Sequence, residues 1–478
     1  MVKKIYLNGE WRTSNSQLDV KNSFDNSQID SVYMATQNDV EDAVISAQKA
    51  FEKAKELNTY QIVEALEFIA DEIKKDKEEM GRILSLEGGK PITQALAEID
   101  RGVSTFKLAA QTLATQRDEV LNLDITPASG KRIGIVKRFS AGIVYGISSF
   151  NFPLNLVAHK VAPAIATRSP IILKPASATP LTALKLAEIF DKTNLPKGLF
   201  QVLPMSREVG DLLVEDDRIS VLSFTGSPAI GWDLKKRASN KKVVLELGGD
   251  AALYIHKDAD LSFAVQKAVQ GSFFNAGQIC ISIQRLIVHS EIYDEFKFNF
   301  INEVKKLSAK NPLDKEAVMS SLIDEKNAIR IENWVREAQD KGVELLTPLS
   351  RQNACVNPVV LENTPSGLDI SQQEAFGPIV NLYKVDSATQ AFEKINESKF
   401  GLQAGIITNN NQLIFEAFEK IDVAGLIVND FPTFRVDNMP YGGIKESGFG
   451  REGVAYAMKD FTEEKVLVLN QNYKYKNE

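Results

Sequence analysis

The segment ISVLSFTGSPAIGWDLKKRAS, from Ile219 to Ser239, changes its pattern midway. The first half is a short apolar run typical of a buried strand, and the second half reads as a helix. The turn between them contains Gly226 and Ser227, and Gly231 follows shortly after. Glycines let a backbone approach a ligand closely, and a helix N-terminus attracts phosphate. The segment predicts a strand–turn–helix unit with a weak phosphate-site signal, because it does not match G-x-G-x-x-G.

Other short apolar runs separated by turn residues and helical patterns surround this segment. They predict βαβ units and a parallel sheet. A second set of runs begins near AALYIHKDAD and predicts another α/β unit that contains Cys280. The first set is GIVYGISSF, SPIILKPAS, LFQVLP and KVVLELGG; the second continues with RLIVHS, IVNLYKV, AGIITN and AGLIVND.

The regions outside these two sets are read from apolar spacing. Residues 37–54 and 60–90 carry apolar residues three and four apart and predict amphipathic helices, the second closing on Gly-Gly. KRIGIVKRF (131–139) and KVLVLNQN, starting at Lys465, look like isolated strands that need partners. Exposed strand edges of this kind are often covered by another subunit.

Length and composition limit the class of protein. With 478 residues, two or more domains are expected. Hydrophobic residues make up 44% and charged residues 25%, with no run of about 18 apolar residues and no secretory signal, so we expect a cytoplasmic protein without membrane segments. A net charge of −7 offers no footprint for nucleic acid. Two cysteines and three scattered histidines predict neither a disulfide framework nor a metal site, and Cys355 is read as a structural thiol.

Each candidate chemical group has an ordinary structural interpretation beside the functional one. Cys280 follows Asn-Ala-Gly-Gln-Ile and is a nucleophile or a small buried hydrophobe. Glu246, at the end of an apolar strand, is a general base with a raised pKa or a cap of the next segment. Asn151 is an oxyanion donor or a turn residue. Lys174 ends a strand where ligands of open α/β sheets bind, or it is a solvated lysine.

The joint order of the motifs decides between these interpretations. It resembles the aldehyde dehydrogenase superfamily across nearly the whole chain. The motifs are Asn-Phe-Pro at 151–153, Lys-Pro at 174–175, Phe-Thr-Gly-Ser at 224–227, Glu-Leu-Gly-Gly at 246–249, Gly-Gln-Ile-Cys at 277–280, Glu-Ala-Phe-Gly-Pro at 374–378 and Pro-Tyr-Gly-Gly-Ile-Lys-Glu-Ser-Gly at 440–448.

The resemblance implies roles for the catalytic residues. Cys280 would attack the aldehyde carbonyl and carry a thiohemiacetal, which becomes a thioester once hydride has left. Glu246 would activate the water that hydrolyses the thioester and help to deprotonate the thiol, which at a reference pKa of about 8.5 is mostly protonated at neutral pH. The amide of Asn151, with the backbone N–H of Cys280, would stabilise the oxyanion.

The resemblance also implies a nicotinamide coenzyme. Lys174 would contact the adenosine ribose, Ser227 the pyrophosphate, and Glu374 the nicotinamide ribose, with Phe376 beside the ring. Where NAD-specific relatives often carry a glutamate for the ribose hydroxyls, this chain has Ser177. Because serine does not repel a 2′-phosphate as a carboxylate would, we expect NADP or NAD, with NADP favoured.

The implied α/β fold has three parts. A Rossmann-like coenzyme domain takes residues 1–120 and 141–247, and an α/β catalytic domain takes 248–450. A small β-ribbon from 121–140 and 451–478 joins subunits, so we expect a homodimer or homotetramer.

The aldehyde is expected to be small and polar or anionic. PTFRVDNMPYGG and FPLNLVAHK look most like the branch acting on lactaldehyde, glyceraldehyde phosphates and phosphonoacetaldehyde, with succinate semialdehyde as the main alternative. Arg101, His159 and Arg435 fall in segments that border the substrate entrance in similar enzymes, and guanidinium groups suit carboxylates and phosphates. Ile279 stands where some phosphate-handling relatives carry arginine, which weakens the case for a doubly charged group.

Rival functions remain. A thiol hydrolase needs a histidine to activate Cys280 and would leave the nucleotide motifs without a role. A CoA-acylating relative generally lacks the glutamate found at Glu246. A binding or structural protein on the same scaffold is opposed by the presence of Cys280, Glu246 and Asn151 together.

Overall fold

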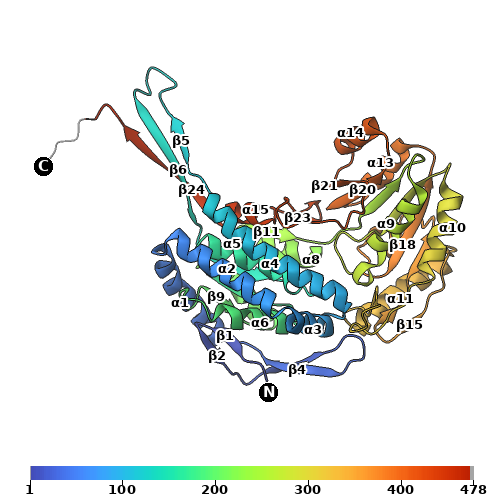
Figure 1. Cartoon of the computed structure of the whole chain (residues 1–478), viewed down its shortest axis with the longest axis horizontal. Helices are drawn as coiled ribbons and strands as arrows, with labels where there is room; N and C mark the ends of the chain where they lie inside the picture. The colour runs from blue at the N-terminus through green and yellow to red at the C-terminus, as the bar shows by residue number, and fades with distance from the viewer. Residues whose placement is uncertain (1, 474–478) are drawn as a thin grey trace.

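The computed structural model describes residues 2–473 and contains two large sheets. Figure 1 shows helices α1 to α6 gathered around the first sheet and α9 to α14 around the second. The expected α/β fold is therefore present. The part of the predicted ribbon at 474–478 lies outside the described residues.

The first sheet has eight strands in the order β2-β1-β9-β8-β7-β10-β11-β23, and its strands from β9 to β11 run parallel. All five strands expected between residues 141 and 249 are confirmed as β7 to β11. Their neighbours β1, β2 and β23 were not expected, and they pair antiparallel at the two edges. The strands are β1 Ile5–Leu7, β2 Glu10–Arg12, β7 Ile143–Ile147, β8 Ile171–Lys174, β9 Phe200–Val202, β10 Ile219–Thr225, β11 Lys242–Glu246 and β23 Gly448–Phe449.

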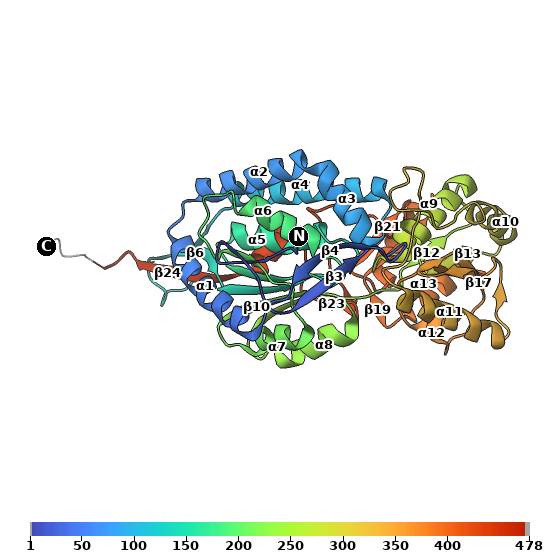
Figure 2. The same cartoon turned by 90° about the horizontal axis from the view of Figure 1, so that it is seen from below.

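Alternate residues of the first sheet pack on opposite faces, as period-2 geometry requires. In β8, Ile171 and Leu173 join the core beneath α2, α4, α5 and α6, whereas Ile172 joins the core beneath α1, α7 and α8. Figure 2 shows these helices on the two sides of the sheet. The helices are α1 Gln37–Lys55, α2 Thr59–Lys75, α3 Lys77–Gly88, α4 Ile92–Thr115, α5 Asn155–Ala166, α6 Leu181–Phe190, α7 Arg207–Glu215 and α8 Pro228–Arg237.

The second sheet has seven strands in the order β14-β17-β18-β13-β12-β20-β21. It contains every strand expected for the second unit, and β23 at 448–449 returns to the first sheet from within the range assigned to the catalytic domain. The elements are β12 Ala252–Ile255, α9 Leu261–Phe273, η1 Phe274–Gly277, β13 Arg285–His289, α10 Tyr293–Val304, α11 Glu325–Asp340, β14 Glu344–Leu345, β17 Val359–Glu362, α12 Asp369–Gln372, β18 Ile379–Val385, α13 Ala388–Asn396, β20 Gln403–Ile407, α14 Asn411–Lys420 and β21 Gly425–Val428. The last helix, α15 Val454–Asp460, packs against α4 and α5 of the first unit.

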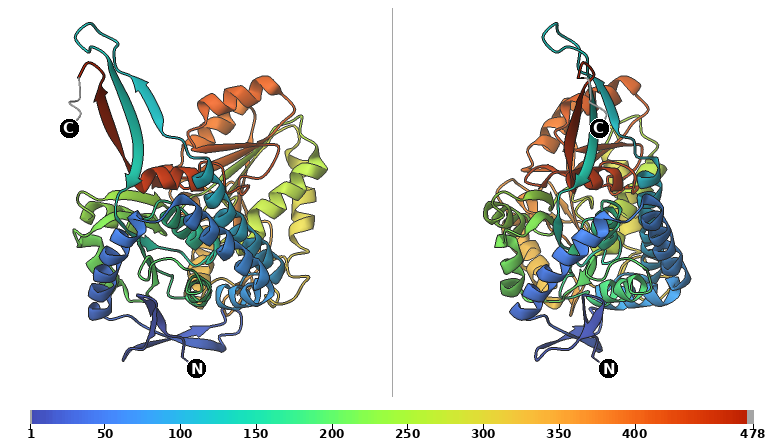
Figure 3. Two further views of the ribbon diagram at one scale, coloured as in Figure 1. Left: turned by 60° about the vertical axis from the view of Figure 1, so that its left-hand side comes forward. Right: turned by 90° about the vertical axis from the view of Figure 1, so that its left-hand side faces the viewer.

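The two isolated strands of the sequence are each other's partner. β6 (Arg132–Ser140) and β24 (Thr462–Asn470) pair antiparallel along their whole length, and β5 (Glu119–Asn122) adds a third strand. Figure 3 shows this three-stranded arm projecting from the body. Val466 and Leu467 on β24 are more than half exposed, so the arm presents apolar side chains to solvent. The short ribbons elsewhere are β3 Gln17–Lys21, β4 Gln28–Tyr33, β15 Arg351–Gln352, β16 Cys355–Val356, β19 Phe400–Gly401 and β22 Ile444–Lys445.

The prediction of a single helix over residues 60–90 is wrong, because the structure has two helices there, α2 and α3. The break is at Asp76, which ends α2 and begins α3 with φ −89° and ψ 15°. The charged residues around the break gave no apolar signal, so the spacing alone did not reveal it. The stop at Gly89 is confirmed, with a left-handed φ of 62°. Among residues 2–473, no helix combines the length and the apolar character that crossing a membrane requires.

Glu87, near the end of α3, fixes this helix against α6. Its buried carboxylate accepts hydrogen bonds from the backbone N–H groups of Leu181 and Thr182 at 2.8 and 3.0 Å. α6 has no side-chain cap at Pro180, so Glu87 supplies the cap from another helix. An exposed ion pair, Glu79–Lys185 at 3.1 Å, joins the same two helices.

We predict that Glu87→Ala lowers the free energy of unfolding by about 2 kcal/mol, because two buried N–H groups lose their acceptor. Thermal unfolding should show a fall in Tm of about 2–4 °C. Glu79→Ala is the matched control, and the loss of this exposed pair should cost about 0–1 kcal/mol. Equal losses in the two variants would contradict the capping role of Glu87.

Candidate active site

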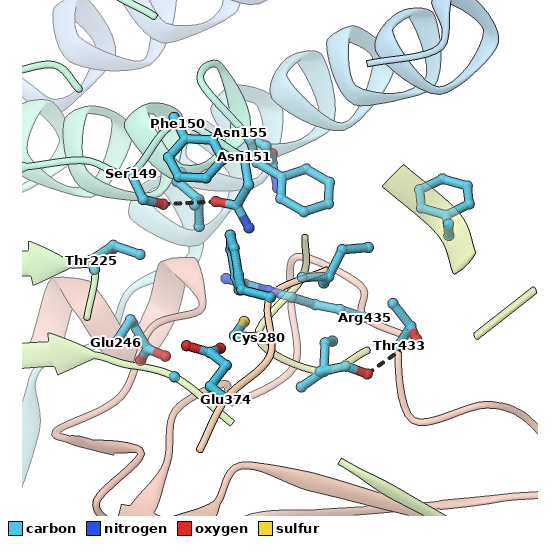
Figure 4. Close-up of a pocket in the computed structure, with 18 of the residues that line it drawn as sticks. Ser149, Phe150, Asn151, Asn155, Thr225, Glu246, Cys280, Glu374, Thr433 and Arg435 are labelled. Atoms are coloured by element: carbon cyan, nitrogen blue, oxygen red, sulfur yellow. Dashed lines mark hydrogen bonds between the residues drawn. The ribbon is translucent and has the colours of Figure 1, made fainter. Parts of the chain in front are cut away.

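One pocket of about 570 Å³ lies between the two α/β units and is lined by residues of both. Figure 4 shows the side chains of Asn151, Glu246, Cys280 and Glu374 directed into this space. The expected site residues that line it are Arg101, Asn151, Gly226, Ser227, Glu246, Cys280, Glu374, Phe376 and Arg435. Lys174, Ser177, Gly231 and His159 are not among its lining residues.

The chain reaches Cys280 through a strained turn. Asn275, Ala276 and Gly277 all have left-handed backbone angles, with φ of 50°, 54° and 71°. Such angles are costly for residues with a Cβ and persist only when the surroundings enforce them. A Cβ on Gly277 would lie 2.2 Å from the carbonyl oxygen of Gly377, so the turn packs directly against the segment after Glu374.

Gln278 and Gly249 hold the loop on either side of Cys280. The buried Gln278 side chain accepts a hydrogen bond from the N–H of Ile323 at 2.8 Å and donates to the carbonyl of Ser321 at 3.3 Å. A Cβ on Gly249 would lie 2.3 Å from the carbonyl oxygen of Cys280. The Glu-Leu-Gly-Gly motif is therefore required sterically by the cysteine loop.

The thiol of Cys280 is partly buried among mostly apolar side chains. Its Sγ lies 2.9 Å from the Tyr441 hydroxyl. Burial raises the pKa of Cys280 to about 12, although the Tyr441 hydrogen bond acts in the opposite direction. Because reaction as a nucleophile requires the thiolate, the site needs groups that favour the anion during the reaction.

Glu246 ends β11 and is buried, and neither carboxylate oxygen has a hydrogen-bond partner within residues 2–473. Burial, followed by the charge of Glu452, raises the pKa of Glu246 well above its usual value. Glu452 behaves in the opposite way: burial raises its pKa, but Lys160 at 3.0 Å and Arg435 at 3.2 Å outweigh this and lower it to about 2. Glu246 is thus the carboxylate of this pair that can accept a proton near neutral pH.

Asn151 sits at the start of the segment that leads into α5. Its Oδ1 accepts a hydrogen bond from the Ser149 hydroxyl at 2.8 Å, and its Nδ2 donates to the carbonyl of Gln278 at 3.0 Å. These bonds fix the amide's orientation beside the cysteine loop. One of the two amide N–H groups remains for another acceptor.

The turn after β10 fits a phosphate-bearing coenzyme. Gly226 and Ser227 lie in the pocket, and Ser227 precedes α8 without capping it through its side chain. Thr225 Oγ1, just before them, is buried and without a partner among the described residues. Gly231 lies in the first turns of α8, and a Cβ there would meet Leu247 at 2.3 Å, so its role is close packing.

Lys174 and Ser177 lie at the carboxyl end of β8, away from the lining of the main pocket. Burial lowers the pKa of Lys174, whereas Asp211 favours its charged form. Ser177 is exposed in the turn that follows.

Glu374 lies beside the cysteine loop and contacts the Gly-Gly segment that follows Glu246. Its Oε1 accepts a hydrogen bond from the N–H of Gly249 at 3.0 Å, and burial raises its pKa to about 7. Phe376 has a left-handed φ of 46° and packs edge-on against Phe150, with ring centroids 5.7 Å apart. Glu374 and Phe376 thus form one wall of the pocket.

The expected substrate residues differ in position. Arg101 and Arg435 line the pocket, but each is paired: Arg101 donates to Asp437 at 2.7 Å, and Arg435 contacts Glu452. Arg101 is the more accessible, with 30% of its side chain exposed against 7% for Arg435. His159 does not border the entrance; it is fully buried behind Asp437, with its Nε2 2.9 Å from the same carboxylate oxygen.

Sequence reasoning did not single out Tyr441, Glu452, Lys160 and Asp437 as site residues. Tyr441 could have been identified from the sequence, since it lies in the Pro-Tyr-Gly-Gly motif quoted above. Lys160 and Glu452 are far apart in the chain and become neighbours only through the packing of α5 and α15. No group of three or more potential metal-binding side chains occurs in the described part of the chain.

Known proteins resemble this chain over nearly its whole length. The model of the aldehyde dehydrogenase family matches residues 11–467. The 3-sulfolactaldehyde dehydrogenase of Priestia aryabhattai is 39% identical over 98% of this chain and 98% of that protein. Aldehyde dehydrogenase 21 from Physcomitrella patens, solved with the reaction product succinate, is 44% identical over 98% and 99%, with a TM-score of 0.96. Glyceraldehyde-3-phosphate dehydrogenase GapN from Methanocaldococcus jannaschii, solved with NADP, is 37% identical over 96% and 100%, with a TM-score of 0.92.

We predict that Gly277→Ala destabilises the protein by about 3 kcal/mol, from left-handed strain plus the clash with Gly377. Gly342→Ala is the matched control, because Gly342 has a φ of 82° but a Cβ added there would have nothing within 4 Å. That variant should lose only about 1 kcal/mol. Thermal unfolding compares the two, and an equal loss would show that close packing at Gly277 has no energetic role.

Proposed function

The chain belongs to the aldehyde dehydrogenase family and is an NAD(P)-dependent aldehyde dehydrogenase, and we propose that it oxidises a small anionic aldehyde to its carboxylic acid. The observation that carries the proposal is the convergence of Cys280, Glu246 and Asn151 on the pocket that also receives Ser227 and Glu374. This pocket contains a nucleophile, a base, an amide donor and a phosphate-binding turn.

Cys280 is the proposed nucleophile. Its sulfur attacks the aldehyde carbon and forms a thiohemiacetal, and negative charge develops on the former carbonyl oxygen. Asn151 is oriented by its bonds to Ser149 and Gln278, so its remaining N–H is available for this oxygen together with the backbone N–H of Cys280. One preorganised donor of this kind typically lowers the barrier by about 3 kcal/mol.

NADP or NAD, when bound, supplies the acceptor for the hydride that leaves the thiohemiacetal carbon. Ser227 and the start of α8 would hold the pyrophosphate, Lys174 would contact the adenosine ribose, and Glu374 would contact the nicotinamide ribose beside Phe376. Ser177 places no carboxylate where it would repel a 2′-phosphate, so we favour NADP. The GapN structure solved with NADP supports this preference.

Glu246 is the proposed base for hydrolysis of the thioester. Both of its oxygens are free of protein partners within residues 2–473, and burial keeps its pKa well above the usual carboxylate range. It therefore takes a proton from the attacking water more readily than an exposed glutamate. The neighbouring Glu452 stays ionised because it is paired with Lys160 and Arg435, and its negative charge favours the protonated form of Glu246.

The substrate class rests on the arginines and on the relatives. Arg101, Arg330 and Arg435 bring guanidinium groups to a pocket whose other lining is partly apolar or aromatic and partly polar. Guanidinium groups recognise carboxylate, sulfonate and phosphate oxygens well. The names of these three relatives point to a sulfonate, a carboxylate and a phosphate, whereas other relatives are named for the uncharged lactaldehyde, so a small polar aldehyde is the shared feature and the anionic end is the finer proposal.

Succinate semialdehyde is a specific candidate within this class. The relative solved with succinate is 44% identical, above the values for the other two. Ile279 before the cysteine also fits a single carboxylate better than a doubly charged phosphate.

The arm formed by β5, β6 and β24 is the proposed site of assembly into a homodimer or homotetramer. It exposes a row of apolar side chains that a second copy would cover. A reactive thiol at Cys280 requires reducing conditions, which favours the cytoplasm.

We predict that Cys280→Ala abolishes aldehyde oxidation but leaves NADP binding within about twofold of wild type, because the sulfur carries every covalent step. Glu246→Gln should give one rapid burst of reduced coenzyme and then slow turnover, since hydrolysis lacks its base. In wild type, the hydrolysis rate should rise with pH through the raised pKa of Glu246. Stopped-flow absorbance at 340 nm measures both phases. Residual turnover in Cys280→Ala would refute the mechanism.

We predict that 3-sulfolactaldehyde, glyceraldehyde 3-phosphate or succinate semialdehyde has a higher kcat/KM than lactaldehyde or hexanal, measured with both coenzymes. Arg101→Met should lower kcat/KM for the anionic aldehydes by about 10- to 100-fold, the value of one charged hydrogen bond, and change hexanal little. Arg435→Met should lower kcat/KM for both classes, because Arg435 also pairs with Glu452 and stacks on Tyr441. Lys107→Met, on the solvent side of α4, is the control. If hexanal is the best substrate, or Arg101→Met keeps the ranking of wild type, the anionic pocket is wrong.

A further inference from the structure

The sulfur of Cys280 is hydrogen-bonded to a phenol rather than to a carboxylate. The Tyr441 hydroxyl lies 2.9 Å from Sγ. Within residues 2–473, no other hydrogen bond to this sulfur is present. Tyr441 is only 3% exposed, so solvent does not compete for its hydroxyl. Before an aldehyde binds, the hydrogen bond from Tyr441 is therefore the contact that orients the Cys280 sulfur.

Tyr441 is fixed by contacts that leave its ring little freedom. Its N–H donates to the carbonyl of Glu452 at 3.0 Å, and its carbonyl accepts from the N–H of Glu452 at 2.6 Å. The Arg435 guanidinium lies 3.7 Å from the ring centroid and is itself paired with the Glu452 carboxylate. Backbone pairing, stacking and the ion pair therefore form a closed set of contacts behind the phenol.

The charges around the sulfur explain why such a donor is needed. Burial and the carboxylates of Glu374 and Glu246 all disfavour the thiolate, whereas the Tyr441 hydrogen bond and the Arg435 charge favour it. A thiolate only accepts hydrogen bonds, so the phenol must be the donor when the sulfur is ionised. Burial, and then the Cys280 and Glu246 charges, keep the pKa of Tyr441 well above its usual value, so the phenol retains its proton at neutral pH.

We propose that Tyr441 is a further catalytic residue, whose hydroxyl donates a hydrogen bond to Cys280 Sγ, stabilises the thiolate and holds it for attack. The stacked Arg435 strengthens this donor by drawing electron density from the ring face. The proposal rests on the proposed role of Cys280 as nucleophile. Arg435 then serves the sulfur through Tyr441 as well as the substrate.

The test is the pH dependence of Cys280 alkylation by iodoacetamide, measured without aldehyde or coenzyme. A Cys355→Ser background leaves one thiol in the chain, because the sequence contains only two cysteines. In Tyr441→Phe, the midpoint of the rate profile should move further upward, so the alkylation rate at a fixed pH below that midpoint should fall about 10- to 100-fold, the expected effect of losing one charged hydrogen bond. Phenylalanine keeps the ring beneath Arg435, so a role in packing alone predicts an unchanged profile.

A second variant keeps the hydroxyl and changes only its acidity. Incorporation of 3,5-difluorotyrosine at 441 makes the phenol a stronger donor and should move the midpoint down, opposite to Tyr441→Phe. Matching profiles for wild type and both variants would overturn the proposal. Alkylation reports on the thiol without turnover, so this result stands apart from Cys280→Ala, whose retention of activity would refute the proposed function instead.

Discussion

The arrangement of the site depends on how closely the turn before Cys280 packs against two glycine segments. Residues 275–277 adopt left-handed angles, and Gly277 and Gly249 leave no room for a Cβ beside Gly377 and the Cys280 carbonyl. This contact joins the loop after α9 to the end of β11 and to the segment before β18. The sulfur, the Glu246 carboxylate and the Glu374 carboxylate are therefore placed by one set of steric constraints, and the strain is held by the surrounding core.

Burial then gives similar side chains different chemistry. Glu246 and Glu452 are both buried, yet only Glu452 has cationic partners, Lys160 and Arg435. Its pKa falls while that of Glu246 rises, so one carboxylate stays charged and the other is suited to proton transfer. The same Arg435 stacks on Tyr441 and so connects this ion pair to the thiol. A second cluster, around Asp437, holds Arg101 at the pocket and places His159 behind it.

Several elements could be predicted because their signals are local. Buried strands such as β8 and β10 are continuous apolar runs bounded by turn residues, and the pattern alone identified them. The break at Asp76 escaped prediction because it falls in a charged stretch without apolar residues, so the apolar spacing on either side gave no sign of it. The joining of β6 and β24 in one ribbon was expected only from the family resemblance, since the two strands are separated by most of the chain and no local pattern records the contact.

The sequence by itself determined the α/β fold, the family and the identity of Cys280, Glu246 and Asn151 as candidates, because these depend on residue types at fixed spacing along the chain. Tertiary structure alone decided what surrounds them. In the folded chain, Tyr441 is the hydrogen-bond partner of the Cys280 sulfur, and Glu452 forms ion pairs with the nearby cations. His159 is buried outside the pocket. The physical reason is that hydrogen bonds, burial and charge act over a few ångströms in space, whereas a sequence motif records only neighbours along the chain.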